Sequence, residues 1–201
     1  MRYRVPYATG FVDNSDFRGG WAALKTLHFL RHAKSGEGDP AGTDHARPLT
    51  ERGVSDAKAL ALYLGKQKIS VDRVYCSSSQ RTRETYDLVA PGLGKDQVAF
   101  RDRLYLVDTS DLMEFIQTLP DIAHNVMIIG HNPTFYVTAL TLLKDAAHGQ
   151  AEAFKALKEK FSTGALASMT FNVEHWRDVH AASATLTGYV RPKDIGAGKN
   201  A

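Results

Sequence analysis

Four side chains that can bind and attack an oxyanion follow three apolar runs of the sequence. Arg31 and His32 come directly after LHFL, Arg81 follows VYCSSSQ, and His131 follows NVMIIG. An arginine fork matches the oxygens of a phosphate group bidentately, and the nitrogen of a neutral imidazole is a competent nucleophile. These residue types predict a phosphate pocket in which one imidazole attacks the phosphoryl group and the other three side chains stabilise its oxygens.

An imidazole attack forms a phosphoramidate on the protein and divides hydrolysis into two displacements, so this chemistry needs no metal ion and no cofactor. The histidines show no HExxH spacing, and no CxxC pair is present. Lys34, Ser35 and Arg47, in the long polar segment after the first run, are candidates for the mouth of the pocket. Asp44 and Arg47 either border the mouth or pair with each other, and the pairing is favoured.

The elements that must position these residues alternate between strands and helices. Short apolar runs predict strands at 25–30, 71–77, 98–100 and 125–130. Helical spacing predicts a helix at 51–66 with Thr50 as its N-cap, one after Ser79, one capped by Thr109 or Ser110, and two pieces within 134–160 broken near Gly149. Two late strands are expected at 166–173 and 184–190, meeting at an edge of the sheet.

This alternation predicts an α/β fold with a mainly parallel sheet. Ligands of open parallel sheets bind beyond the carboxyl ends of the strands, so the three junctions are expected to meet at one edge. The predicted organisation is an irregular N-terminal arm over 1–24, a single domain over 25–192 and a short C-terminal tail over 193–201.

Composition narrows the classes of protein further. The chain has 201 residues, 25 Lys and Arg against 22 Asp and Glu, a net charge of +3 and one cysteine, Cys76. One domain of ordinary size is therefore expected, without a disulfide framework or a zinc site built on paired thiolates. The mild charge gives no indication of nucleic-acid binding, and the lack of a long apolar stretch predicts a cytoplasmic protein without membrane association.

Several segments together resemble the histidine phosphatase superfamily, in particular its SixA-type phosphohistidine phosphatase branch. They are RHAKS, RPLTERG, CSSSQRTRET, RLYLVDTSDLMEFI, VMIIGHNP and FSTGALASMTF, in the family's order over about residues 25–192. The resemblance implies a three-layer α/β/α fold of the phosphoglycerate mutase type. It also implies that His32 is the nucleophile that becomes phosphorylated, that Arg31 and Arg81 bind phosphate and that His131 is the second histidine. Ala33 replaces the usual glycine, and Ser78 stands where many members have proline.

The general acid of the family lacks a clear counterpart. Leu106 stands where similar SixA-type sequences often have glutamate, which leaves Asp108 as the candidate acid or, alternatively, as a helix cap. An alkoxide leaving group resembles hydroxide, whose conjugate acid has a pKa of ~15.7, whereas the conjugate acid of imidazole has a pKa of about 6.5. A site without a placed acid should therefore prefer phosphohistidine, in a phosphorylated protein, and release inorganic phosphate.

Other interpretations remain at this point. They are a phosphomonoesterase for a small phosphate ester, a phosphoglycerate-type mutase and a non-catalytic phosphate-binding module. A cysteine phosphatase is disfavoured, because Cys76 and Arg81 are five positions apart where C-x5-R requires six. Cys76 is instead expected to be a buried strand residue, and His175 and His180 are expected to face solvent.

Overall fold

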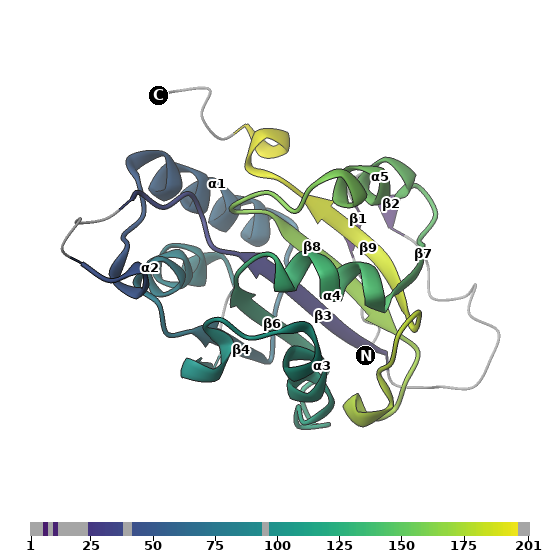
Figure 1. Cartoon of the computed structure of the whole chain (residues 1–201). Helices are drawn as coiled ribbons and strands as arrows, with labels where there is room; N and C mark the ends of the chain where they lie inside the picture. The colour runs from purple at the N-terminus through teal and green to yellow at the C-terminus, as the bar shows by residue number, and fades with distance from the viewer. Residues whose placement is uncertain (1–5, 8–9, 12–23, 38–41, 94–96, 197–201) are drawn as a thin grey trace.

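A seven-stranded sheet runs through the centre of the computed structural model, which describes residues 6–7, 10–11, 24–37, 42–93 and 97–196 (Figure 1). The sheet has the order β5-β4-β6-β3-β8-β9-β7. Its strands are β3 (Lys25–Arg31), β4 (Arg73–Ser77), β5 (Val98–Arg101), β6 (Asn125–Gly130), β7 (Leu143–Ala146), β8 (Leu166–Phe171) and β9 (Ala184–Val190). Only β8 runs against the direction of the other strands of this sheet, so the predicted α/β fold is confirmed.

Helices cover both faces of the sheet. They are α1 (Glu51–Lys66), α2 (Gln80–Val89), α3 (Thr109–Gln117), α4 (Thr134–Leu142) and α5 (Ala151–Glu159). Alternate side chains of β6 point to opposite faces of the sheet and belong to two hydrophobic cores. Met127 and Ile129 pack with α1, while Val126 and Ile128 pack with α3 and α4. The resulting three layers match the predicted α/β/α arrangement. None of the helices in the described ranges is both long and apolar enough to cross a bilayer.

The strands and helices that hold the candidate residues lie close to their predicted bounds. Thr50 caps α1 by accepting a hydrogen bond from the backbone N–H of Gly53 at 3.1 Å, as expected of an N-cap threonine. Strand β6 covers the predicted 125–130, and β3 extends one residue further, to Arg31. Cys76 is buried between the sheet and α1, and this burial raises the pKa of its thiol to about 12, which confirms a structural role for that side chain.

Three details of the predicted elements are wrong. The second strand begins at Arg73 rather than at Val71, and α3 is capped by Asp108, the alternative role predicted for that residue, and not by Thr109 or Ser110. The late strands do not meet at an edge: β8 pairs with the central β3, and β9 is covered by β7, a short strand within the region expected to be helical. An exposed edge strand of four residues that contains Lys144 and Asp145 carries too little apolar patterning to be recognised.

The described part of the predicted N-terminal arm contains one short antiparallel pair. Strand β1 (Pro6–Tyr7) pairs with β2 (Gly10–Phe11), and the rest of the arm lies outside the described residues. At the other end, a 3-10 helix, η6 (Pro192–Ile195), follows β9 and packs against α1. Figure 1 shows η6 as the yellow helical turn beside α1.

Candidate active site

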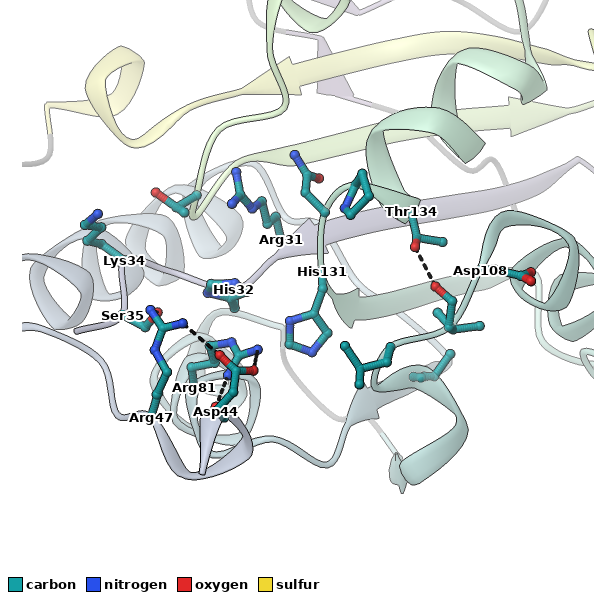
Figure 2. A pocket seen from close by; sticks show the side chains of 16 residues that line it. Arg31, His32, Lys34, Ser35, Asp44, Arg47, Arg81, Asp108, His131 and Thr134 are labelled. Carbon is teal, nitrogen blue, oxygen red and sulfur yellow. Dashed lines mark hydrogen bonds and ion pairs between the residues drawn. The ribbon is translucent and has the colours of Figure 1, made fainter. Parts of the chain in front are cut away.

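The carboxyl ends of β3, β4 and β6 open into one cavity of about 600 Å³, and all of the residues predicted for the site line it (Figure 2). Arg31 ends β3, His32 follows it, Arg81 lies in the first turn of α2 and His131 follows β6. The cavity is also lined by Lys34, Ser35, Arg47 and Asp108, together with Asp44, Leu104, Leu106, Val107, Asn132, Pro133, Thr134 and Thr163. The three strand ends therefore converge as expected for a mainly parallel sheet.

The imidazole of His32 is held as a neutral base with one nitrogen free. Its side chain is buried, and its Nδ1 lies 2.8 Å from the carbonyl oxygen of Ala33. Because a carbonyl only accepts, Nδ1 carries the proton and Nε2 keeps its lone pair. Burial, with smaller contributions from the nearby guanidinium groups, lowers the pKa of His32 to about 4 against the opposing effect of the Ala33 hydrogen bond. A neutral imidazole with a free Nε2 is competent for nucleophilic attack.

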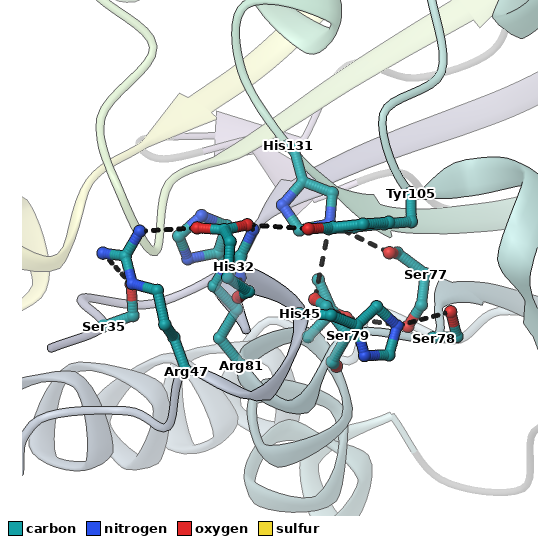
Figure 3. Close-up of polar contacts among 12 residues, drawn as sticks. His32, Ser35, His45, Arg47, Ser77, Ser78, Ser79, Arg81, Tyr105 and His131 are labelled. Atoms are coloured by element: carbon teal, nitrogen blue, oxygen red, sulfur yellow. Dashed lines mark hydrogen bonds and ion pairs between the residues drawn. The ribbon is translucent and has the colours of Figure 1, made fainter. Parts of the chain in front are cut away.

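His131 faces His32 across the floor of the cavity and is fixed by serine hydroxyls from β4 and its junction with α2 (Figure 3). The two imidazole centroids lie 5.2 Å apart, and His131 Nε2 lies 2.9 Å from Ser77 Oγ and 3.4 Å from Ser79 Oγ. Burial, with smaller contributions from His32 and Arg81, lowers the pKa of His131 to about 3. Sequence reasoning missed Ser77, although its place as the last residue of β4 puts it on the same sheet edge.

Arg31 is anchored by one end of its guanidinium group. Its Nη1 donates a 2.8 Å hydrogen bond to the carbonyl oxygen of Phe161, which also accepts from Asn132 Nδ2 at 3.0 Å. Its buried Nε has no hydrogen-bond partner among the described residues. Burial lowers the pKa of Arg31, yet a guanidinium remains charged in proteins. A half-buried cation with an unpaired N–H at the end of β3 is suited to an anionic ligand.

Arg81 shares the carboxylate of Asp44 with two further side chains. Its Nη2 donates to Asp44 Oδ2 at 3.0 Å and its Nη1 to the Asp44 carbonyl oxygen at 2.6 Å (Figure 2). Arg47 Nη1 donates to Oδ1 and Tyr105 Oη to Oδ2, both at 2.8 Å. These hydrogen bonds hold the pKa of the Asp44 carboxyl well below its usual range. The predicted pair of Asp44 and Arg47 is confirmed, but no pattern in the sequence indicated that Arg81 joins it.

Asp108 lines the cavity but is engaged as a helix cap. Its Oδ1 accepts hydrogen bonds from the backbone N–H of Asp111 and from Ser110 Oγ, each at 2.8 Å, and these bonds lower the pKa of its carboxyl. The side chain is exposed, and Figure 2 shows its carboxylate turned away from the two imidazoles. Leu106, two residues earlier, is 81% exposed at the cavity rim and has a left-handed φ of 57°. Of the described residues that line this cavity, the two carboxylates, Asp44 and Asp108, are thus both held as anions.

The cavity therefore brings together three guanidinium groups, from Arg31, Arg47 and Arg81, and the imidazoles of His32 and His131. Within the described ranges, no group of three or more His, Cys, Asp and Glu side chains is arranged to hold a metal ion. The chemistry that these side chains can carry out directly is the binding of an oxyanion by Arg31 and Arg81 and attack by a neutral imidazole.

Comparisons with known proteins agree with this arrangement. Residues 27–118 match the model of the histidine phosphatase superfamily, branch 1. "Uncharacterized protein Rv1276c" of Mycobacterium tuberculosis (strain H37Rv) is 32% identical over 164 residues, which cover 82% of this chain and all of that protein.

Two solved structures show the same fold. The "Putative Phosphohistidine Phosphatase SixA" of Nakamurella multipartitia is 31% identical, with a TM-score of 0.72 over 85% of this chain and 98% of that one. The protein histidine phosphatase SixA in complex with tungstate is 23% identical, with a TM-score of 0.64 over 85% of this chain and 99% of that one. With this likeness in sequence and fold, the chain belongs to the histidine phosphatase superfamily, in its SixA-type branch, and is a phosphatase.

Proposed function

We propose that this phosphatase hydrolyses phosphohistidine in a protein partner through a phosphorylated His32. The observation that carries the proposal is the state of the two carboxylates in the cavity. Asp44 is held by Arg47, Arg81 and Tyr105, and Asp108 caps α3, so neither is poised to protonate a leaving alkoxide. A leaving group that needs little protonation fits this site better than the alkoxide of a sugar or serine phosphate.

In the first displacement, Arg31 and Arg81 hold the phosphoryl oxygens while His32 Nε2 attacks phosphorus. The bond between His32 Nε2 and phosphorus forms as the bond between phosphorus and the substrate imidazole breaks. When the other ring nitrogen of the substrate imidazole is protonated, that ring departs as neutral imidazole, so the protein supplies no proton. The Nδ1 hydrogen bond from His32 to the Ala33 carbonyl oxygen keeps Nε2 directed at the phosphoryl group throughout.

In the second displacement, water attacks the phosphorus of phosphorylated His32. The P–N bond breaks, the electron pair returns to His32 Nε2, and the protons of the water go to the phosphate product and to solvent. His131 is neutral in the free site because burial and nearby cations disfavour its charge. A bound phosphoryl dianion reverses that field, so His131 can then donate a proton to an equatorial oxygen and stabilise the charge that develops there.

A comparison of three substrates tests the proposal. Initial rates are measured, with EDTA present, on a phosphohistidine peptide, an aryl phosphate and an alkyl phosphate. The expected result is a clear preference for phosphohistidine that is lost in His32→Ala and kept in Asp108→Asn, whose amide oxygen can still cap α3. Faster hydrolysis of the alkyl ester, abolished by Asp108→Asn, would instead identify Asp108 as an acid and a small phosphate ester as the substrate.

A second readout separates catalysis from binding alone. Rapid acid-free quenching during turnover should trap phosphate on the wild-type protein and none on His32→Ala. If no substrate is turned over although inorganic phosphate still binds, the site functions as a phosphate-binding module and the proposal is wrong.

A further inference from the structure

A second cavity, of about 400 Å³, adjoins the candidate active site. Arg31, Lys34 and Thr163 line both cavities, so the second one begins where the phosphate pocket ends. Figure 2 shows Arg31 and Lys34 on the side of the pocket that faces away from Asp108. Any substrate longer than its phosphoryl group can therefore extend from His32 along this side.

The lining of the second cavity is strongly basic. Six cationic side chains border it, against the single carboxylate of Asp56: Arg31, Lys34, Arg52, Lys160, Arg191 and Lys193. Asp56 is 4% exposed, and burial raises the pKa of its carboxyl while Arg52 opposes that effect. Two other carboxylates lie close by, because Asp194 and Glu159 both act on Arg191. A clear excess of positive charge remains around the cavity.

The arginines and the lysines of this cavity differ in what they are free to bind. The Arg191 fork is occupied by Asp194, with Nε and Nη2 donating at 2.8 and 3.0 Å, and Arg52 lies 3.7 Å from Asp56. In contrast, Lys34, Lys160 and Lys193 are exposed and form no ion pair with a carboxylate in the part of the chain that the structure describes. The free charges are thus mobile ammonium groups and not forks preset for a second phosphate.

The walls of the cavity are fixed in place by the fold. Gly164 donates its backbone N–H to the carbonyl oxygens of Arg31 and His32, and a Cβ there would lie 2.9 Å from Pro192 Cγ. On the opposite wall, the carbonyl oxygen of Lys34 accepts the backbone N–H of Thr50 at 2.9 Å, and any Cβ at Gly53 would clash with it. The backbone segments that carry Lys34 and Lys193 therefore lie close to the backbone around His32, while their ammonium groups remain mobile.

We propose that this basic cavity, defined by Lys34, Lys160 and Lys193, binds acidic side chains that flank the phosphohistidine of the protein substrate. This inference rests on the proposed function, because it concerns the residues next to the phosphohistidine of the proposed protein substrate. Exposed lysines suit carboxylates, which need no bidentate geometry, and their attraction steers an acidic partner toward the pocket. The cavity thereby selects among phosphoproteins, while the pocket around His32 carries out the chemistry.

Three phosphohistidine peptides of equal length test this assignment, with flanking residues that are acidic, neutral amide or basic. The wild-type protein should show the highest kcat/KM on the acidic peptide, through a lower KM, and 0.5 M salt should remove most of that advantage. Lys160→Glu combined with Lys193→Glu should lower kcat/KM on the acidic peptide about tenfold relative to free phosphohistidine, because each exposed ion pair contributes up to about fivefold in affinity. Lys144→Glu combined with Lys155→Glu, an equal charge change at exposed sites outside both cavities, should leave the preference intact.

Each other outcome overturns the assignment. No preference for the acidic peptide in the wild type, or an equal loss in the Lys144 and Lys155 variant, would leave only a general charge effect. A second phosphate site would be indicated if a small bisphosphate inhibits the wild type more strongly than the Lys160 and Lys193 variant, while both hydrolyse the acidic peptide equally well. The same peptides are also tested for binding to His32→Ala, which cannot hydrolyse them. Tighter binding of the acidic peptide there would support acidic recognition even if the proposed hydrolysis fails.

Discussion

Replacing Asp44 with asparagine should tighten the binding of oxyanions to the phosphatase. The Asp44 carboxylate lies 3.0 Å from Arg81 Nη2, on a guanidinium group that also faces the phosphate pocket. A phosphate or tungstate ion on the same guanidinium, held by a hydrogen bond of about 2.9 Å, would lie roughly 6 Å from that carboxylate. Asp44 and the bound anion therefore repel each other while they share one cation.

The size of this repulsion follows from the exposure of Asp44. Its side chain is 49% exposed, so a water-like dielectric is appropriate. Two unit charges about 6 Å apart then repel by ~0.7 kcal/mol, and a dianion is repelled by about 1.4 kcal/mol, or about tenfold in affinity. The amide of asparagine keeps an oxygen that accepts from Arg81, so the arginine should stay in place when the charge is removed.

The assay measures inhibition constants for inorganic phosphate and tungstate. Each ion competes with an aryl phosphate substrate at neutral pH and low salt. Asp44→Asn should bind both ions about tenfold more tightly than the wild type. Asp108→Asn is the matched control, because Asp108 lines the same cavity without contacting Arg81, and its constants should stay within about twofold. Unchanged or weaker binding by Asp44→Asn would refute the competition and mean that the charge of Asp44 is needed to hold Arg81.

Three further predictions concern other side chains of the central strands. NMR titration of the imidazole signals should place the His32 midpoint near pH 4, since burial and nearby guanidinium groups disfavour its charged form, and a midpoint near 6.5 would contradict the neutral nucleophile. Ser77→Ala should lower kcat roughly 10- to 100-fold by releasing His131, whereas Ser79→Ala, at the longer distance of 3.4 Å, should have a smaller effect. His28 is buried and has its pKa lowered to about 4. Because the unfolded chain binds the proton more readily, His28 should contribute about 2 kcal/mol to the stability that the protein loses between pH 7 and pH 5. Urea unfolding of His28→Gln should therefore show a loss about 2 kcal/mol smaller than that of the wild type, because His32 and His131 still contribute to it.

The sequence predicted the floor of the active site well because that floor is built from local signals. The buried runs of β3 and β6 are continuous in the sequence, and the residues that line the pocket lie at the end of β3 and directly after both strands. Parallel pairing of Arg31 with Gly130 then places the next residues of the two segments, His32 and His131, side by side. The position of the functional groups follows from strand periodicity and the rule for sheet edges.

The walls of the site could not be predicted in the same way, because they depend on contacts between distant segments. Asp44 meets Arg81 across 37 positions and Tyr105 across 61, and no spacing in the sequence marks these pairs. The basic cavity likewise joins α1, the segment before β8 and the 3-10 helix after β9. Charged residues scattered along a chain show no common surface until the fold brings them together.

The rim position occupied by Leu106 bears on how such enzymes diversify. Its left-handed backbone is costly for leucine and is adopted most readily by glycine, asparagine and aspartate. The segment that carries it joins two helices and contributes no part of the sheet edge that holds His32 and His131. The substitution Leu106→Asp would thus relieve backbone strain and at the same time bring a carboxylic acid to the mouth of the pocket. A change at this one position would therefore alter which leaving groups the enzyme can protonate, without altering the residues that bind and transfer the phosphoryl group.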